Sequence, residues 1–190
     1  MPNNCSIDAG RLNEPVEILA LRETEPTVWA YVPAGRAWAA ITLSEGRNLF
    51  SQVGVGARDA AVVLRRVPLT LGRVLRWRGG VLWPTSIVPM GRGHLEVHAA
   101  VVAVDTVRLR KDETTQAMTF PGVLTEKYAR HTQEWPMSVN DLGLVLVVPK
   151  PVTLRPGTLV EARGALWEVL VPHELDPHKN EYEIGRTVDL

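Results

Sequence analysis

The sequence predicts a mainly β protein, with two tandem small β-barrel-like units and one short helix or loop insertion in the first unit. Short segments rich in alternating and β-branched apolar residues follow one another along the chain. The 15 glycines and 14 prolines interrupt these segments at short intervals, as in small sandwiches and barrels. Motifs of the first half also return in the second half in the same order. Hydrophobic residues make up 45% of the 190 residues, which is enough for a core.

We expect the strands of the first unit to be separated by glycine, proline and charged residues. Leu75 and Trp77 alternate with polar neighbours and should share one face of their strand. Gly79-Gly80 then predicts a tight hairpin to the following strand, and Gly91-Arg92-Gly93 predicts the next turn. The expected strands span residues 16–21, 60–64, 74–78, 81–83 and 95–99.

Two segments break this strand pattern. Residues 44–53 could form a short helix capped by Ser44, and Gly54-Val55-Gly56 would end it. Residues 111–122 are polar and end in Pro-Gly, so we interpret them as a linker. The expected organisation is therefore a first domain at 1–110, a linker at 111–122 and a second, related β domain at 123–190.

An internal repeat supports the two-domain interpretation. Each copy contains a strand, a glycine-centred hairpin, a strand with Trp, a proline-containing turn and a closing strand. Trp77, Trp83 and Trp167 are expected in the cores, whereas Trp29, Trp38 and Trp135 lie nearer to loops and could serve interfaces. The matching pairs are Pro68–Leu71 with Pro151–Leu154, Leu75 with Leu159, Gly80 with Gly164, Leu82 with Leu166, Trp83 with Trp167, Val88-Pro89 with Val171-Pro172, and Leu95–Val97 with Tyr182–Ile184.

The formal net charge is zero, but the charges are unevenly distributed along the chain. Residues 1–110 hold thirteen arginines, no lysine and nine acids, whereas residues 111–190 hold eight basic residues and twelve acids. The excess is densest at Arg58, Arg65, Arg66, Arg73, Arg76 and Arg78, opposed only by Asp59. Arginines in this pattern form either a solvated strand face or a face toward a polyanion, an acidic neighbour or another copy.

Composition excludes several classes of protein. A zero net charge argues against a general nucleic-acid coating protein, and the single Cys5 excludes a disulfide framework. The apolar runs are far shorter than the ~20 residues of a membrane helix, and the N-terminus lacks a signal-peptide pattern. We therefore expect a soluble protein that is made in a reducing compartment and has no contact with a membrane.

Few residues point to catalysis. His173 and His178 are flanked by prolines and lack the spacing of a helical zinc site, and His94 and His98 share a strand face without a third ligand. Gly54-Val55-Gly56 lacks the lysine of a phosphate-binding loop. We expect no enzyme activity, no catalytic residues, no cofactor and no metal.

Several motifs follow one another in a fixed order in the first half of the chain. They are Gly10-Arg11-Leu12, the strand Val16–Leu21, Arg36–Ile41 as a short Trp-Ala strand, Glu45-Gly46-Arg47 with Gln52, a strand ending in Arg65, and Val74–Trp77 with its Gly-Gly hairpin. With these motifs, residues 11–104 resemble the head–tail joining, or head-closure (stopper), proteins of long-tailed phages. A departure is the turn at residues 23–26, where the family has Asp-Tyr-Gly. The segment from residue 123 looks like the second β module of larger stoppers.

The resemblance implies a structural virion protein at the phage neck, made in the host cytoplasm. Such proteins form a homo-oligomeric ring, usually twelve-fold, which closes the DNA-filled head and provides the docking surface for the tail. The implied partners are the portal or adaptor protein, the tail terminator protein and the packaged double-stranded DNA.

Two groups of residues are candidates for these contacts. The segment 42–58 would supply a channel-facing or portal-facing loop, with Arg47, Asn48, Leu49, Phe50, Gln52 and Arg58 as its candidate residues. The basic face of Arg65, Arg66, Arg73, Arg76 and Arg78 would lie between subunits or toward DNA. An ordinary surface loop and a solvated strand face are the alternatives. A tail terminator or tail-completion ring protein is the alternative function, and binding to the tail tube instead of the portal would distinguish it.

Overall fold

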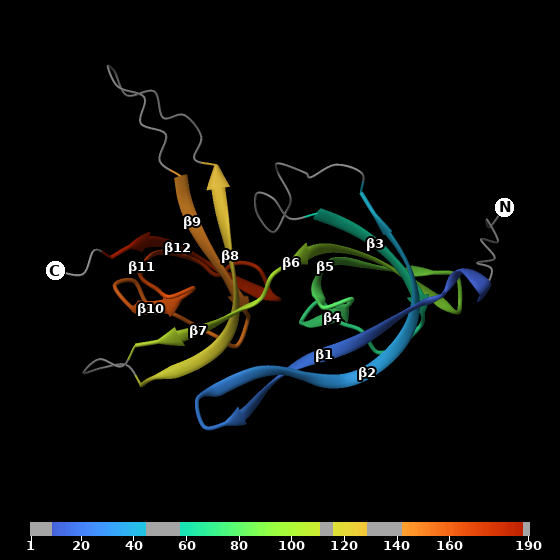
Figure 1. Cartoon of the computed structure of the whole chain (residues 1–190), viewed down its shortest axis with the longest axis horizontal. Helices are drawn as coiled ribbons and strands as arrows, with labels where there is room; N and C mark the ends of the chain where they lie inside the picture. The colour runs from blue at the N-terminus through green and yellow to red at the C-terminus, as the bar shows by residue number, and fades with distance from the viewer. Residues whose placement is uncertain (1–8, 45–57, 111–115, 129–141, 188–190) are drawn as a thin grey trace, which may run out of the picture. The chain divides into compact units, whose positions relative to one another are not determined.

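The computed structural model describes residues 9–44, 58–110, 116–128 and 142–187 (Figure 1). These residues form a mainly β structure with twelve strands and one 3-10 turn at Ala9–Arg11. Their contacts divide them into two compact units, one made of residues 9–22, 30–44 and 58–103, the other of residues 23–29 and the described residues from 104 onward. None of the helical structure in these ranges is long and apolar enough to cross a membrane.

The first unit contains a closed sheet of six strands. Its strand order is β1-β4-β5-β6-β3-β2, and β2 pairs with β1 to close the ring. The neighbouring strands whose registers are known are all antiparallel. The strands are β1 (Glu14–Glu25), β2 (Val28–Leu43), β3 (Arg58–Arg65), β4 (Arg73–Trp77), β5 (Gly80–Met90) and β6 (His94–Val102).

The second unit contains another closed sheet of six strands. Its order is β8-β7-β10-β11-β12-β9, and β9 pairs with β8 to close the ring. Val28, which belongs to this unit, also pairs with Thr119 of β8. The strands are β7 (Asp105–Leu109), β8 (Met118–Tyr128), β9 (Leu142–Pro149), β10 (Leu159–Ala162), β11 (Ala165–His173) and β12 (Lys179–Arg186).

The two sheets have the same connectivity. Each strand of the first unit has the ring neighbours of the strand six places later in the second unit. From β4–β6 to β10–β12, equivalent residues are 85 positions apart: Leu75 pairs with Leu82, and Val160 pairs with Trp167. The β-bulge at Thr85 returns at Leu170, because the register shifts between residues 84 and 86 and again between 169 and 171. The internal repeat is therefore present in the structure.

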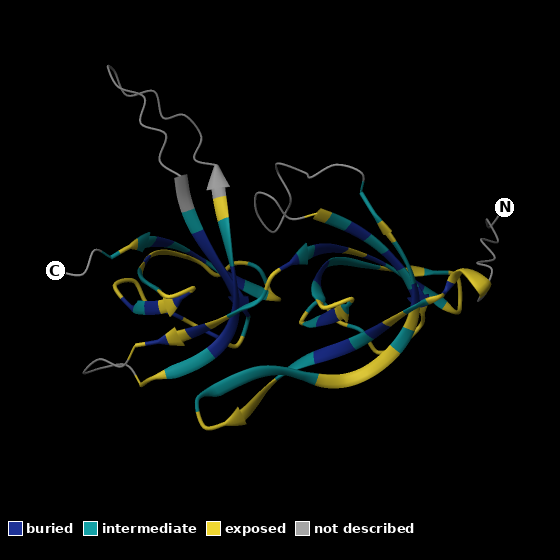
Figure 2. Cartoon of the chain, in the orientation of Figure 1, coloured by how far each residue is buried: buried dark blue, intermediate teal, exposed yellow. Residues whose placement is uncertain are grey.

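All six strands of each unit contribute side chains to its core. Figure 2 marks buried residues in dark blue along strands of both units. Alternation along the strands produces this arrangement: Val62 and Leu64 in β3 are fully buried, whereas Arg65 is exposed. In the second unit the largest fully buried side chains are Tyr182 and Phe120. Equivalent positions carry different side chains, since Val97 of the first core corresponds to Tyr182 of the second.

The expected strands are confirmed, but the hairpin turn is one residue earlier than predicted. Trp77 pairs with Gly80, so the two turn residues are Arg78 and Gly79, with φ of 47° and 80°. A two-residue turn of this kind needs positive φ at both positions. The prediction assigned the turn to Gly79-Gly80 because glycine adopts that conformation most easily.

The matching residues of the repeat also differ from the predicted ones. Gly164 corresponds to Gly79 instead of Gly80, and Trp167 corresponds to Leu82 instead of Trp83. The sequence comparison paired identical residues, whereas the strand registers pair positions in the sheet. Equivalent core positions of the two units thus have the same place in the strand pairing but carry different side chains.

The segments expected to lie outside strands have mixed outcomes. Residues 118–122 of the expected linker form the start of β8 and pair with β7. The division between the units by contacts falls at residues 103 and 104. The expected helix at 44–53 lies outside the described residues except for Ser44, whose backbone N–H donates to the carbonyl of Asp59.

Candidate interaction surface

The arginines of β4 and its turn lie beside carboxylates of β1. Strands β1 and β4 are antiparallel neighbours, and Glu17 is directly opposite Arg76 in their register. Glu14 lies three residues before Glu17 and pairs with Arg78. The sequence prediction recognised only Asp59 as an opposing charge, because β1 and β4 are distant in the sequence.

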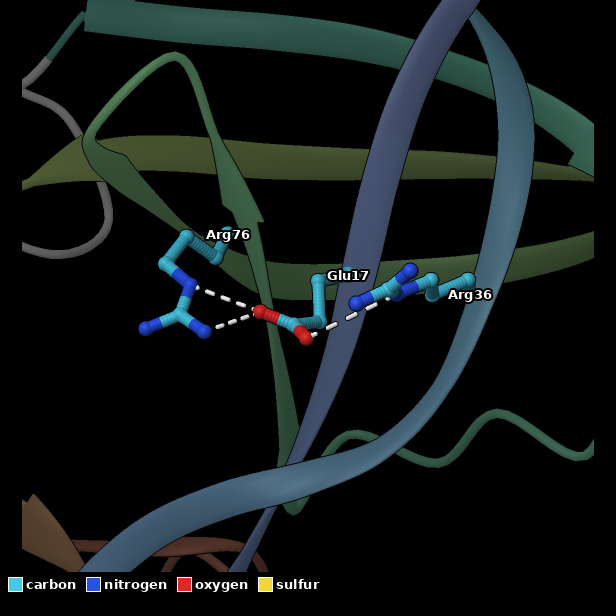
Figure 3. A network of polar contacts seen from close by, with 3 residues as sticks. All are labelled: Glu17, Arg36 and Arg76. Carbon is cyan, nitrogen blue, oxygen red and sulfur yellow. Dashed lines mark hydrogen bonds and ion pairs between the residues drawn. The ribbon is translucent and has the colours of Figure 1, made fainter.

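Glu17 connects two arginines from different strands (Figure 3). The Nε of Arg76 donates to Oε2 of Glu17 at 2.8 Å, and its Nη2 bonds to the same oxygen. The Nε of Arg36 in β2 lies 3.8 Å from Oε1 of Glu17. The side chain of Arg36 is 87% exposed, against 19% for Glu17. One carboxylate therefore faces two guanidinium groups, and this group of residues retains a positive charge.

Glu14 holds the hairpin turn of β4 and β5. Its carboxylate accepts a hydrogen bond from Nε1 of Trp77 at 3.0 Å and pairs with the guanidinium of Arg78. That guanidinium also lies over the Trp77 ring, with its central carbon 4.9 Å from the ring centroid. The hydrogen bond from Trp77 is the main cause that holds the pKa of Glu14 below its ordinary value; burial opposes it, and the hydrogen bond and charge of Arg78 add to the lowering.

The remaining arginines of the predicted basic face do not act as one group. Arg73 donates to the backbone carbonyl of Pro68, and Arg58 donates through Nε to the carbonyl of Ser44 at 2.8 Å. Arg65 and Arg66 are exposed at the end of β3. Thus Arg58, Arg73, Arg76 and Arg78 have partners within the first unit, and Arg65 and Arg66 retain more freedom to contact another molecule.

Trp38 lies between two shallow concavities on the first unit. Its side chain is 60% exposed, which is unusual for a large aromatic residue in a strand. One concavity, of about 560 Å³, is lined by Leu12, Arg36, Ala37, Trp38, Arg65 and Val67. The other, of about 620 Å³, shares Arg36, Ala37 and Trp38, and adds Glu17 and Arg76. We call these two concavities with Trp38 the Trp38 groove; three arginines and one glutamate line it.

Four of the other tryptophans lie within the described residues; three of them pack against a core, whereas Trp83 is buried but belongs to neither core cluster. Trp83 is 4% exposed and packs edge-to-face on Tyr31, with ring centroids 6.3 Å apart. Trp77 packs against the first core, as expected, and Trp167 packs against the second. Trp29, which follows the turn at Pro26-Thr27 as expected, is partly buried and packs against the second core. Trp38, which was expected nearer to a loop as a possible interface residue, lies within β2 and is exposed.

The charges of the two units differ in sign. Within the described residues the first unit has ten arginines against four acids, and the second has eight basic residues against ten acids. The second unit places Glu161 and Glu168 on exposed positions of β10 and β11. The uneven charge seen along the sequence is therefore a difference between the two units.

The histidine pairs occupy surface positions. His98 lies 3.9 Å from Glu96 on β6, and Nε2 of His173 lies 3.0 Å from Oε1 of Glu183 across β11 and β12. His178 follows a turn in which Asp176 accepts hydrogen bonds from the backbone N–H groups of residues 178 and 179. In the described ranges no three His, Cys, Asp or Glu side chains are grouped as metal ligands would be.

Most residues of the predicted channel-facing or portal-facing loop lie outside the part of the chain that the structure describes. Arg47, Asn48, Leu49, Phe50 and Gln52 lie outside the described residues, as does Trp135. Arg58, the first described residue after them, pairs with Val101 of β6. The loop hypothesis stays a prediction.

Comparisons with family models, with curated proteins and with solved structures give no match for this chain.

Proposed function

We propose that this chain is a structural protein of the phage neck, where a homo-oligomeric ring closes the DNA-filled head and provides the docking surface for the tail. The proposal treats the two units as tandem barrel-like domains and assigns no catalytic step to them. The proposed partners are the portal or adaptor protein, the tail terminator protein and the DNA in the channel. The ring is proposed to have twelve copies and to be located in the virion.

The observation that carries the proposal is the repetition of one closed six-stranded sheet in both units. Within the described residues each sheet closes on itself and has no edge strand, which favours association through side-chain surfaces. The first unit has such a surface in the Trp38 groove. Small β units that join through modest surfaces gain strength when a ring repeats each contact many times. The motifs of residues 11–104 supply the link to head-closure proteins.

The ion pairs of Arg76 and Arg78 with carboxylates are compatible with a protein beside a DNA channel. Many free arginines would bind phosphate strongly and oppose the passage of DNA, because phosphate contacts add up. Arg76 and Arg78 are instead paired with Glu17 and Glu14. These two ion pairs reduce the positive charge that the face would present to DNA, while the first unit as a whole keeps more arginines than acids in its described residues.

Imaging of purified particles tests the proposal. Particles that carry a labelled version of this chain should show its density in a ring between head and tail. Density at the tail end of the neck, with binding to the tail tube and none to the portal, would favour a tail terminator. Density anywhere else in the particle would contradict both functions.

A further inference from the structure

We infer that the Trp38 groove of one copy binds the outer face of β11 in a second copy, around Glu168 and Leu170. This inference rests on the proposed function, because it names the surfaces through which the ring would form. It also stands on two complementary surfaces that are carried by the same chain.

The groove offers an aromatic ring between positive charges. Trp38 is 60% exposed, and Arg36 beside it has only a long ion pair, at 3.8 Å, with Glu17. Arg65, which lines the concavity of about 560 Å³, makes no ion pair or side-chain hydrogen bond with the described residues. A partner that suits this groove needs an apolar side chain for Trp38 and a carboxylate for the guanidinium groups.

The outer face of β11 offers these two groups side by side. Leu170 is 51% exposed at the β-bulge, and Glu168 is exposed two residues earlier. Leu170 lies over Gly185 of β12, where an added Cβ would come 3.2 Å from its Cδ1. Because Gly185 has no side chain, the Leu170 side chain can lie over it and still keep half of its surface exposed.

The surroundings of Glu168 leave its carboxylate available. Its neighbours in the register are Leu159 on β10 and Gly185 on β12, neither of which carries a charge. Across the described part of the chain, no cation forms an ion pair with Glu168. By contrast, Glu183 pairs with His173 and Glu181 pairs with Lys179. Glu168 is thus a carboxylate that a guanidinium of another molecule can reach.

A second copy is the occupant that charge favours. The groove lies on the unit with excess arginine, and Glu168 lies on the unit with excess acid. The two surfaces are different, so the contact is head-to-tail: each copy uses its groove on one neighbour and its β11 face on the other. A contact of this type repeats and closes into a ring when the rotation between copies allows it.

Charge reversal on each side tests the contact. The variants Arg36→Glu and Glu168→Arg should each weaken self-association at least about tenfold, since each sets like charges against each other. An equal mixture of the two variants should associate again, because every contact in an alternating array then joins opposite charges. Sedimentation equilibrium measures the association, and it should weaken with added salt.

Two matched variants control for the change of charge itself. Arg92→Glu alters an exposed arginine in the turn before β6, and Glu126→Arg alters an exposed glutamate in β8; both should associate like the unchanged chain. Trp38→Ser should weaken association without changing charge. Circular dichroism of every variant verifies that the fold is retained.

Three results would overturn the inference: an unchanged chain that is monomeric up to about 1 mM, a mixture that fails to associate, or control variants that weaken association equally. Particle imaging separates this inference from the proposed function. If the chain forms a ring at the neck and neither charge reversal weakens self-association, the proposed function stands and the proposed contact surfaces are wrong. If the mixed variants associate again but particles show no density at the neck, the contact surfaces are supported and the proposed function is wrong.

Discussion

Arg78 and Arg163 occupy the same position in two turns of the same geometry. Each is the first residue of a two-residue hairpin turn, with φ of 47° and 52°, and each is followed by a glycine at positive φ. An ion pair holds each arginine, to Glu14 for Arg78 and to Asp105 for Arg163. The partner carboxylate lies on β1 in the first unit and on β7 in the second, which are equivalent strands.

Alanine at the second turn position should destabilise both units. Gly79 and Gly164 have φ of 80° and 72°, where a side chain is strained although nothing lies within 4 Å of an added Cβ. We expect Gly79→Ala and Gly164→Ala each to lower the free energy of unfolding by about 1 kcal/mol in urea denaturation. Gly93→Ala, in open space without positive φ, is the control and should be neutral. Equal stability of all three variants would refute the strain argument.

Gly122→Ala should destabilise the second unit by overpacking. An added Cβ would lie 2.9 Å from both Leu146 Cδ1 and Val107 Cγ2 in the core. We expect a loss of about 1–3 kcal/mol in the free energy of unfolding. Adding Val107→Ala to this variant should recover part of the loss, which a double-mutant cycle measures. A fully additive cycle would show that the two sites are independent.

Asn180→Leu should be costly although the side chains are similar in size. Asn180 is fully buried and donates through Nδ2 to the carbonyls of Lys150 and Val152, at 3.2 and 2.7 Å. Leucine would leave these carbonyls without their donor, so the free energy of unfolding should fall by about 1–3 kcal/mol. Lys150→Ala removes a donor to Asn180 Oδ1 but leaves both carbonyls bonded, and should cost less. An Asn180→Leu variant as stable as the unchanged chain would contradict this account.

The stability of the chain should depend on Glu14 at low pH. The folded state lowers the pKa of Glu14 from its ordinary 4.5, chiefly through the hydrogen bond from Trp77. The ionised carboxylate therefore contributes stability above pH 4.5, and this contribution is lost as the pH falls through the lowered pKa. The difference in unfolding free energy between the unchanged chain and Glu14→Gln should shrink over that range. A difference that stays constant as the pH falls would exclude the linkage.

Tyr182 should remain protonated in the folded chain at any pH that the fold survives. Burial and the hydrogen bond from its hydroxyl to Glu174, at 2.6 Å, raise the pKa of Tyr182 above its ordinary 10.0. Because the raised pKa favours the protonated form, the fold should lose stability as the pH rises above 10.0. Tyr182→Phe should lose less stability over this range, as urea denaturation at increasing pH would measure. A steeper loss in the phenylalanine variant would contradict the assignment.

Local pattern was sufficient to predict five strands of the first unit, but it did not predict β7, β8 and β9 of the second. The segments 60–64 and 95–99 alternate or are rich in β-branched residues, and both are strands in the structure. The turn at Arg78 was misplaced because arginine seldom adopts positive φ, so the adjacent Gly79-Gly80 pair was the stronger local signal. Its partners Glu14 and Trp77 make that conformation tolerable.

Distant pairings limited what the sequence could predict about the surface. The contact of Glu17 with Arg76 depends on the pairing of β1 with β4, which no local pattern reveals. The residues of the repeat were misaligned for a related reason. A comparison of sequences pairs identical residues such as Trp83 and Trp167. In the strand registers, however, Trp167 is opposite Val160, and the equivalent pair in the first unit is Leu82 opposite Leu75. Trp38 was considered for an interface because it was expected near a loop, whereas the structure places it within β2.

The β-bulges at Thr85 and Leu170 have the same backbone position in their units but carry side chains of different polarity. At Thr85 the hydroxyl donates to the carbonyl of His98 and is satisfied within its own unit. At Leu170 the same bend displays an aliphatic group to solvent. In a repeated fold, the residue at the bulge of one unit can thus change without altering the other unit or the strand pairing of either.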